Sequence, residues 1–179
     1  MKKLFAIIAI AFAFGMTAKA QMCVHAGYGF DRVSYSGGGH SDFHQFSVGY
    51  AKDFTLGIGA KVGLDYGGTW KMYKAKDGDA KANFLSIPVH VKTYLPIGAT
   101  TKFFAAPGLA ANVGLFGTKN VFGDNGIKRF NLAMEGDLGL IFINMIKVAV
   151  GYEYTITKFQ DINVGNHLSA FRFTVGIVF

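Results

Sequence analysis

Residues that could bind a metal lie close together at one place in this 179-residue chain. His40, Asp42 and His44 occupy alternate positions, and imidazole and carboxylate groups are common zinc ligands. A surface zinc site is one interpretation of this spacing, and a solvated loop is the simpler one. Asp77-Gly78-Asp79 lacks the rest of a calcium-loop pattern, so we interpret it as a turn. We therefore expect neither a metal nor a cofactor.

A serine two positions after a histidine is the second chemical possibility. A histidine can activate a serine when a carboxylate orients its ring. His167 and Ser169 have this spacing, and the arrangement resembles that of outer-membrane lipid A deacylases. No acid follows Ser169, and the acid nearest in the loop is Asp161. We therefore expect no catalytic residues and no enzyme, and keep a lipid-modifying enzyme as an alternative.

The elements that position these residues show a period of two. Large apolar residues alternate with small or polar ones, as in a strand whose side chains point to opposite faces. No sustained helical period of 3.6 is present. The alternation predicts an all-β chain with eight strands, near residues 23–33, 43–52, 54–73, 83–95, 101–115, 129–142, 146–157 and 169–179.

The connections between these strands alternate in length. Short turns are expected at residues 52–53, 96–99 and 143–145. Longer connections are expected at residues 34–42, 74–82, 116–127 and 159–166. Short turns at one end and longer loops at the other are typical of outer-membrane barrels, at their periplasmic and extracellular ends. The pattern predicts an eight-stranded antiparallel up-and-down transmembrane β-barrel.

The apolar face of these strands is expected to point outward into lipid. The opposite face is rich in glycine, which suits a narrow interior, and the chain has 24 glycines with only 16% charged residues. Aromatic residues near the strand ends resemble the girdles at bilayer interfaces. We predict a girdle at the long-loop end that contains Phe30, Tyr66, Trp70, Tyr154 and Phe171. A secreted lipocalin-like barrel is the alternative, with a more charged exterior expected.

Ionisable residues on the polar face are expected to pair inside the barrel, because an isolated ion out of water costs several kcal/mol. A last hairpin centred near residues 162–163 places Glu153 opposite Arg172. A turn centred on Asn144 places Glu135 level with Glu153. Eight strands enclose a space that side chains just fill, so we expect a structural ion-pair core and no open pore. A gate or a proton-binding site is the alternative for the predicted cluster of Glu135, Asp137, Lys147, Glu153 and Arg172.

The first twenty residues are expected to be a cleaved signal peptide. Lys2 and Lys3 precede an apolar run, and Ala18-Lys19-Ala20 has the small-x-small pattern of a cleavage site. The run is shorter than the ~20 residues of a transmembrane helix. Residues 21–179 then form one barrel domain, in which we interpret Cys23 as an unmodified thiol. Without the three lysines the net charge falls from +7 to +4, and nucleic acid is not expected as a partner.

Two segments and the C-terminus resemble a known family. Residues 85–95, Leu-Ser-Ile-Pro-Val-His-Val-Lys-Thr-Tyr-Leu, and residues 104–109, Phe-Ala-Ala-Pro-Gly-Leu, resemble strands of the porin-family outer-membrane β-barrel domain, of the OmpA/OmpX-like eight-stranded type common in Bacteroidetes. The closing residues, 171–179, resemble the same family. Phe179 resembles the terminal signal that the outer-membrane insertion machinery recognises. The resemblance implies a fold and the outer membrane of a Gram-negative bacterium, and it implies no reaction.

These observations predict a monomeric barrel with a structural role or a surface-interaction role through its longer loops. The expected partners are outer-membrane lipids and lipopolysaccharide, and the insertion machinery during biogenesis. Lys71, Lys74, Lys76 and Lys81 surround the second long loop, with Asp77 and Asp79 between them. A solvated hairpin tip is the preferred interpretation, and electrostatic attraction to lipopolysaccharide phosphates is the alternative. A narrow solute channel of the porin kind is the first alternative function.

Overall fold

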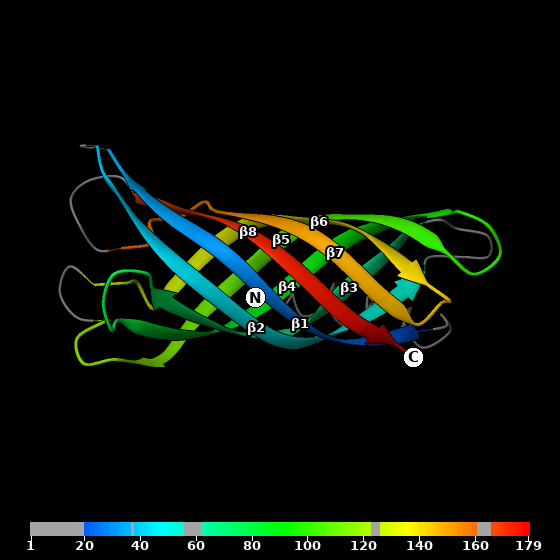
Figure 1. Cartoon of the computed structure of the whole chain (residues 1–179), viewed down its shortest axis with the longest axis horizontal. Helices are drawn as coiled ribbons and strands as arrows, with labels where there is room; N and C mark the ends of the chain where they lie inside the picture. Colours follow the sequence, from blue (N-terminus) through cyan, green and yellow to red (C-terminus); the bar gives the residue numbers. More distant parts are fainter. Residues whose placement is uncertain (1–19, 37, 56–61, 123–125, 161–165) are drawn as a thin grey trace, which may run out of the picture.

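The computed structural model is a closed barrel of eight antiparallel strands that pair in chain order (Figure 1). It describes residues 20–36, 38–55, 62–122, 126–160 and 166–179. The strands are β1 (Ala20–Tyr35), β2 (His40–Thr55), β3 (Val62–Ala75), β4 (Lys81–Pro96), β5 (Lys102–Gly117), β6 (Phe130–Phe142), β7 (Ile146–Thr155) and β8 (Asn166–Val178). The predicted fold class is confirmed. The predicted signal peptide lies outside the described residues except for Ala20.

The last strand closes the barrel by pairing with the first. Tyr28 lies opposite Phe173, and beyond the ladder Met22 and Phe179 exchange two backbone hydrogen bonds of 2.9 and 2.8 Å. Figure 1 shows β8 beside β1 over most of their length. Closure leaves no unpaired sheet edge, which a barrel in lipid requires because hydrocarbon cannot satisfy backbone polar groups.

The predicted turn at residues 52–53 is wrong. Lys52 and Asp53 are inside β2, opposite Met22 and Gln21 of β1, and the strand continues to Thr55. The two charged residues continue the alternation, because Asp53 points into the barrel and bonds there with a lysine of β4, Lys92. The connection to β3 consists of residues 56–61, which lie outside the described residues.

The connections at the opposite end of the barrel are less uniform than predicted. Those of residues 36–39 and 76–80 are short, because β1 to β4 extend further than the alternation indicated. Residues 118–129 and 156–165 are long connections. An isolated bridge between Ile127 and Gln160 joins these two, and Lys128 N–H donates to the Phe159 carbonyl at 2.8 Å. We call this end of the barrel the loop end and the other the turn end.

The apolar face of the strands points outward, as predicted. Val150 and Phe173 are 39% and 50% exposed, whereas Glu153 and Arg172 are 1% and 8% exposed. The described residues contain no helix that is long and apolar enough to cross a membrane. Because the exposed strand residues in this region are large and hydrophobic, the outer wall is an apolar surface over the middle of the barrel.

The five residues of the predicted aromatic girdle do not all lie at the loop end, and the girdle itself stays a prediction. Phe30 and Phe171 lie opposite each other on the outer wall in the loop-end half, and Tyr154 is near the end of β7. Trp70 faces outward between Val48 and Leu85. Tyr66 belongs to the other half, because β3 starts at Val62, and its ring stacks on Phe54 at 5.4 Å near the turn end.

Small residues allow the strands to approach where a side chain has no space. A Cβ atom on Gly67 would meet the carbonyl oxygen of Tyr50, with the Cα of Ala51 at 2.9 Å. Both of these are backbone atoms, so the strands themselves would have to move. Gly136 differs, because the nearest atom to its added Cβ is the Cα of Pro107 at 3.7 Å, an ordinary contact.

We predict that Gly67→Ala destabilises the barrel by about 1–3 kcal/mol, the usual cost of overpacking. Gly136→Ala is the matched control and should change the free energy of unfolding by less than about 0.5 kcal/mol. Urea unfolding in detergent micelles, followed by tryptophan fluorescence of Trp70, measures both. Equal stability of the two variants would contradict the close approach of β2 and β3.

Candidate functional site

The inside of the barrel has three layers, of which the first is an apolar layer at the loop end. Its centre is Phe159, whose ring lies 6.4, 5.9 and 6.2 Å from the rings of Phe43, Tyr73 and Phe84. Phe159 and Ile127 come from the two long connections and fold into the mouth. The layer consists of Val33, Phe43, Tyr73, Ala82, Phe84, Ile127, Phe159 and Leu168. It closes the loop end of the lumen with side chains.

A second apolar layer lies at the turn end. Phe104 is fully buried there and packs among small residues from strands that meet at this end. The layer consists of Cys23, Ala51, Phe104, Ala106, Ile141, Ala149 and Val178. Cys23 is a free thiol inside this layer. The ionisable side chains of the lumen therefore lie between two apolar layers.

The middle layer is a network of ion pairs that starts on β3 and β7. The Lys71 ammonium lies 2.7 Å from a carboxylate oxygen of Glu153 and 3.7 Å from Glu135. The guanidinium of Arg172 lies 3.3 Å from Glu135, 3.0 Å from Asp137 and 3.5 Å from Glu153. Asn112 donates to the second oxygen of Glu153 at 3.1 Å. Two cations thus hold three carboxylates in the middle of the barrel.

The network continues toward the turn end through a histidine. His90 places Nδ1 at 3.2 Å from Asp65 and Nε2 at 3.0 Å from Glu135. The Lys92 ammonium then lies 3.3 Å from Asp65 and 3.2 Å from Asp53. Nδ1 is hydrogen-bonded to Asp65, whereas Nε2 lies near Glu135 without forming a hydrogen bond. The pairs form one connected series from Glu153 to Asp53.

The charges that face the lumen nearly cancel. Five acids of the series, Asp53, Asp65, Glu135, Asp137 and Glu153, face the cations Lys71, His90, Lys92, Lys147 and Arg172. The ammonium of Lys147 lies 5.1 Å from the centre of the Phe104 ring, a cation–π distance. Asp31 also faces inward, and neither of its oxygens has a hydrogen-bond partner among the described residues. The near balance explains how so many charges are tolerated out of water.

The sequence placed most of these residues correctly but paired some of them wrongly. Glu135 lies opposite Glu153, as the turn arithmetic predicted. Arg172, however, lies opposite Gly151, and Glu153 lies opposite Ala170, so the predicted register of the last hairpin is wrong by two residues. Arg172 still reaches Glu153 because its side chain is long. The predicted cluster residues Glu135, Asp137, Lys147, Glu153 and Arg172 all lie inside.

Lys71 is the main member of the network that sequence reasoning missed. It was expected beside the second long loop, but it is 1% exposed and lies in the lumen. Lys71 directly follows Trp70, which points outward, so the alternation of the strand places Lys71 on the inward face. Lys74, Lys76 and Lys81 are exposed at the loop end, as expected.

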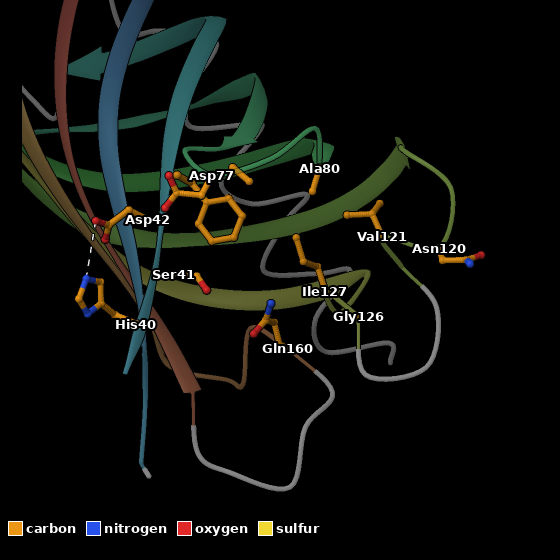
Figure 2. Close-up of a pocket in the computed structure, with 12 residues that line it drawn as sticks. His40, Ser41, Asp42, Asp77, Ala80, Asn120, Val121, Gly126, Ile127 and Gln160 are labelled. Carbon is orange, nitrogen blue, oxygen red and sulfur yellow. Dashed lines mark ion pairs between the residues drawn. The ribbon is translucent and has the colours of Figure 1, made fainter. Parts of the chain in front are cut away.

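The loop end has a separate cavity of about 370 Å³ above the apolar layer. Figure 2 shows His40 and Asp42 on one side of it and Asn120 and Val121 on the other. Gln160 lies between Ser41 and Ile127 at the same cavity. Its rim is therefore polar, while its floor is formed by Phe43 and Ile127.

The two chemical arrangements suggested by the sequence are not assembled in the described residues. Asp42 is bound by Arg32 at 2.8 Å, and His44 Nδ1 pairs with the Tyr28 hydroxyl at 2.7 Å, so two residues of the alternative zinc interpretation have other partners. The described ranges contain no group of three or more metal-binding side chains.

The predicted serine pair is likewise occupied by backbone groups. Ser169 donates to the Arg32 carbonyl at 3.3 Å, and His167 donates from Nδ1 to the Thr155 carbonyl at 2.7 Å. In a catalytic triad Nδ1 would donate to the orienting carboxylate. Asp161 lies outside the described residues. The described contacts therefore leave Ser169 without an activated histidine.

Comparisons with known proteins agree on the fold. No protein-family model matches the chain, and no curated protein sequence matches it. Among solved structures, the outer-membrane enzyme PagL is similar with a TM-score of 0.62 and 14% identity, over 87% of this chain and 98% of that one. Neisserial surface protein A gives 0.56 and 14%, over 87% and 96%. Ail of Yersinia pestis, in complex with the heparin analogue sucrose octasulfate, gives 0.50 and 16%, over 89% and 99%.

The apolar outer wall and this likeness show that the chain has the fold of the transmembrane β-barrels of the outer membrane. The expected eight-stranded antiparallel architecture is confirmed. The location in the outer membrane of a Gram-negative bacterium stays a prediction that this fold supports. The Bacteroidetes type stays a prediction. The similar proteins include an enzyme and a surface protein, so the shared fold leaves the activity open.

We predict that Lys71→Met destabilises the barrel by about 3–5 kcal/mol, because it leaves buried carboxylates without their cation. The double variant Lys71→Met/Glu153→Gln restores the charge balance and should recover at least half of the loss. Lys119→Gln, an exposed loop change, is the control, with less than about 0.5 kcal/mol expected. The measurement is urea unfolding in an uncharged detergent. A double variant as unstable as the single one would contradict the network.

Proposed function

We propose that this protein is a small integral outer-membrane barrel with a filled lumen, whose role is structural or one of surface interaction at the loop end. The observation that carries the proposal is the closure of the lumen by Phe159 and Ile127 at one end and Phe104 at the other. A solute would have to displace packed aromatic rings and then ion pairs. Contacts with partners are therefore made from outside the lumen.

The cavity at the mouth is the place where such a contact fits best. It is open at the loop end and lined by donors and acceptors such as Ser41, Asn120 and Gln160. Its volume of about 370 Å³ is at the lower end for small-molecule sites. A polar residue or small polar group of a partner would fit there. We expect the barrel to act as a monomer surrounded by outer-membrane lipids and lipopolysaccharide, without nucleic acid.

Two other functions are less well supported. A narrow solute channel would need an open path, and both ends of the lumen are filled by apolar side chains. An enzyme is suggested by the likeness to the outer-membrane enzyme PagL, and a lipid-modifying one by the outward position of Ser169. Against it stand the backbone hydrogen bonds made by Ser169 and His167. We therefore propose that the protein is not an enzyme.

We predict that the purified barrel gives no steady conductance in planar lipid bilayers, because its lumen is closed at both ends. An open general porin in the same bilayers is the control. Lipid A from cells that produce the wild type should have the same masses as lipid A from cells that produce Ser169→Ala. Steady conductance would favour the channel, and a mass change lost in Ser169→Ala would establish the enzyme.

We also predict that Phe179→Ala lowers assembly in the outer membrane without lowering stability. The side chain is 68% exposed, so its removal costs little packing, and the backbone bonds to Met22 remain. Outer-membrane fractionation measures assembly, and refolding of purified protein into detergent measures stability. Loss in cells with normal refolding would support recognition by the insertion machinery. Equal loss in both assays would show a structural role only.

A further inference from the structure

Charged side chains are rare on the outward face of the strands and gather at one part of it. Among the described strand residues, Arg32, Asp42, Lys74 and Lys81 face outward near the loop end, and Lys52 faces outward near the turn end. Lys76 follows β3 directly. Within the described parts of β5 to β8, the outward face has no charged residue. The outward cations of the loop end therefore belong to β1, β3 and β4.

These cations lie where the strands leave the membrane. Strands β1, β2 and β4 have 16 residues each, whereas a tilted strand needs about 9–11 to cross the hydrocarbon. Arg32 lies opposite Ser169 and Asp42. One outward position deeper, Phe30 lies opposite Phe171 and His44. Lys74 lies opposite His44, at the end of the row that contains Phe171 and Phe30. We call Phe30 and Phe171 the aromatic row, and the cations beside it and beyond it, Arg32, Lys74, Lys76 and Lys81, the basic row. This is the arrangement expected at the level of lipid headgroups.

One pair of these cations is unfavourable in the protein alone. Lys74 lies directly opposite Lys81, and like charges in this position destabilise a sheet. Neither lysine forms an ion pair with a described residue. Of the acids nearby, Asp42 is bound by Arg32 at 2.8 and 3.2 Å, Asp77 lines the mouth cavity, and Asp79 lies in the tip of the same hairpin. A bound anion would offset the repulsion.

A pocket of about 520 Å³ joins the basic row to the aromatic row on the outer wall. Its polar lining consists of Asp31, Arg32, Asp42, His44, Lys76 and Ser169, in which the Asp31 side chain points inward and Asp42 is bound by Arg32. Lys74 and Lys81 lie beside the pocket and do not line it. Phe30, Tyr152 and Phe171 line its apolar side, and all three are strongly exposed. Arg32 uses two of its five donor N–H groups for Asp42, so others stay free for an anion. The pocket therefore offers cations and aromatic surface to the same ligand.

We propose that this outer-wall pocket, together with Lys74 and Lys81, binds the phosphorylated headgroup of a lipid in the outer leaflet. The phosphate lies among Arg32, Lys76 and the facing lysines, and the acyl chains lie along Phe30 and Phe171. Binding of this kind anchors one side of the barrel, β1 to β4, to a particular lipid. The proposal depends on the outer-membrane location and is independent of the role of the mouth cavity.

The test is native mass spectrometry of the whole barrel in an uncharged detergent, titrated with lipid A that carries two phosphates. The wild type should retain this lipid at least tenfold better than the same lipid after its phosphates are removed. Lys74→Gln/Lys76→Gln/Lys81→Gln should lose at least tenfold in affinity for the phosphorylated lipid. Lys52→Gln, an outward lysine of β2 at the other end, is the matched control and should stay within twofold of wild type.

Three outcomes would overturn the proposal. Equal retention of the two lipids would show that phosphate is not recognised, and a triple variant that binds as the wild type would show that the basic row is not involved. The third outcome concerns inorganic phosphate, added in place of the lipid. If phosphate raises the thermal midpoint of unfolding as much as the phosphorylated lipid does at equal concentration, the site binds free anions and does not recognise a lipid. The variants change exposed side chains, so circular dichroism should show an unchanged barrel.

Discussion

Charge pairing in a space closed to bulk water is the constraint on which the rest of this structure depends. The outer wall must be apolar to lie in lipid, so ionisable residues of the strands are confined to the inside, apart from those at the strand ends. A charge there is tolerated only with a partner and hydrogen bonds. Lys71, His90 and Arg172 each contact two or more carboxylates, which links the five strands β3, β4, β6, β7 and β8, not all of which neighbour one another. The network therefore fixes the barrel's cross-section as well as its interior.

The apolar layers at both ends of the lumen separate this network from bulk water. Phe159 reaches the loop-end layer from a long connection, so the connection serves as part of the core and not only as a surface loop. The same closure moves any contact with other molecules to the outside. The outside of the barrel has two concave sites lined by polar groups, the mouth cavity and the outer-wall pocket. They differ in what surrounds them, since the first faces water and the second faces lipid.

Much of this fold could be predicted because alternation is a local property of each strand. The pairing of Glu135 with Glu153 could be predicted as well, because the turn at residues 143–145 is short and its centre is well defined. The pairing of Glu153 with Arg172 could not, because the long connection before β8 gives no centre to count from. Lys52, Asp53 and Lys71 were misplaced for one reason. A charged residue near a strand end resembles the start of a turn or loop, although each of these three continues the alternation of its strand.

The pairing of β1 with β8 has a consequence for how the protein is made. Most strands contact their neighbours in sequence, so hairpins can form early from local contacts. The seam between the first and last strands joins the most distant parts of the domain, and contacts of that kind are slow to form. Until β8 has paired with β1, the chain has two unpaired strand edges and an exposed apolar face. Both features favour aggregation, so the closing of this seam is the step that protects the folded barrel from self-association.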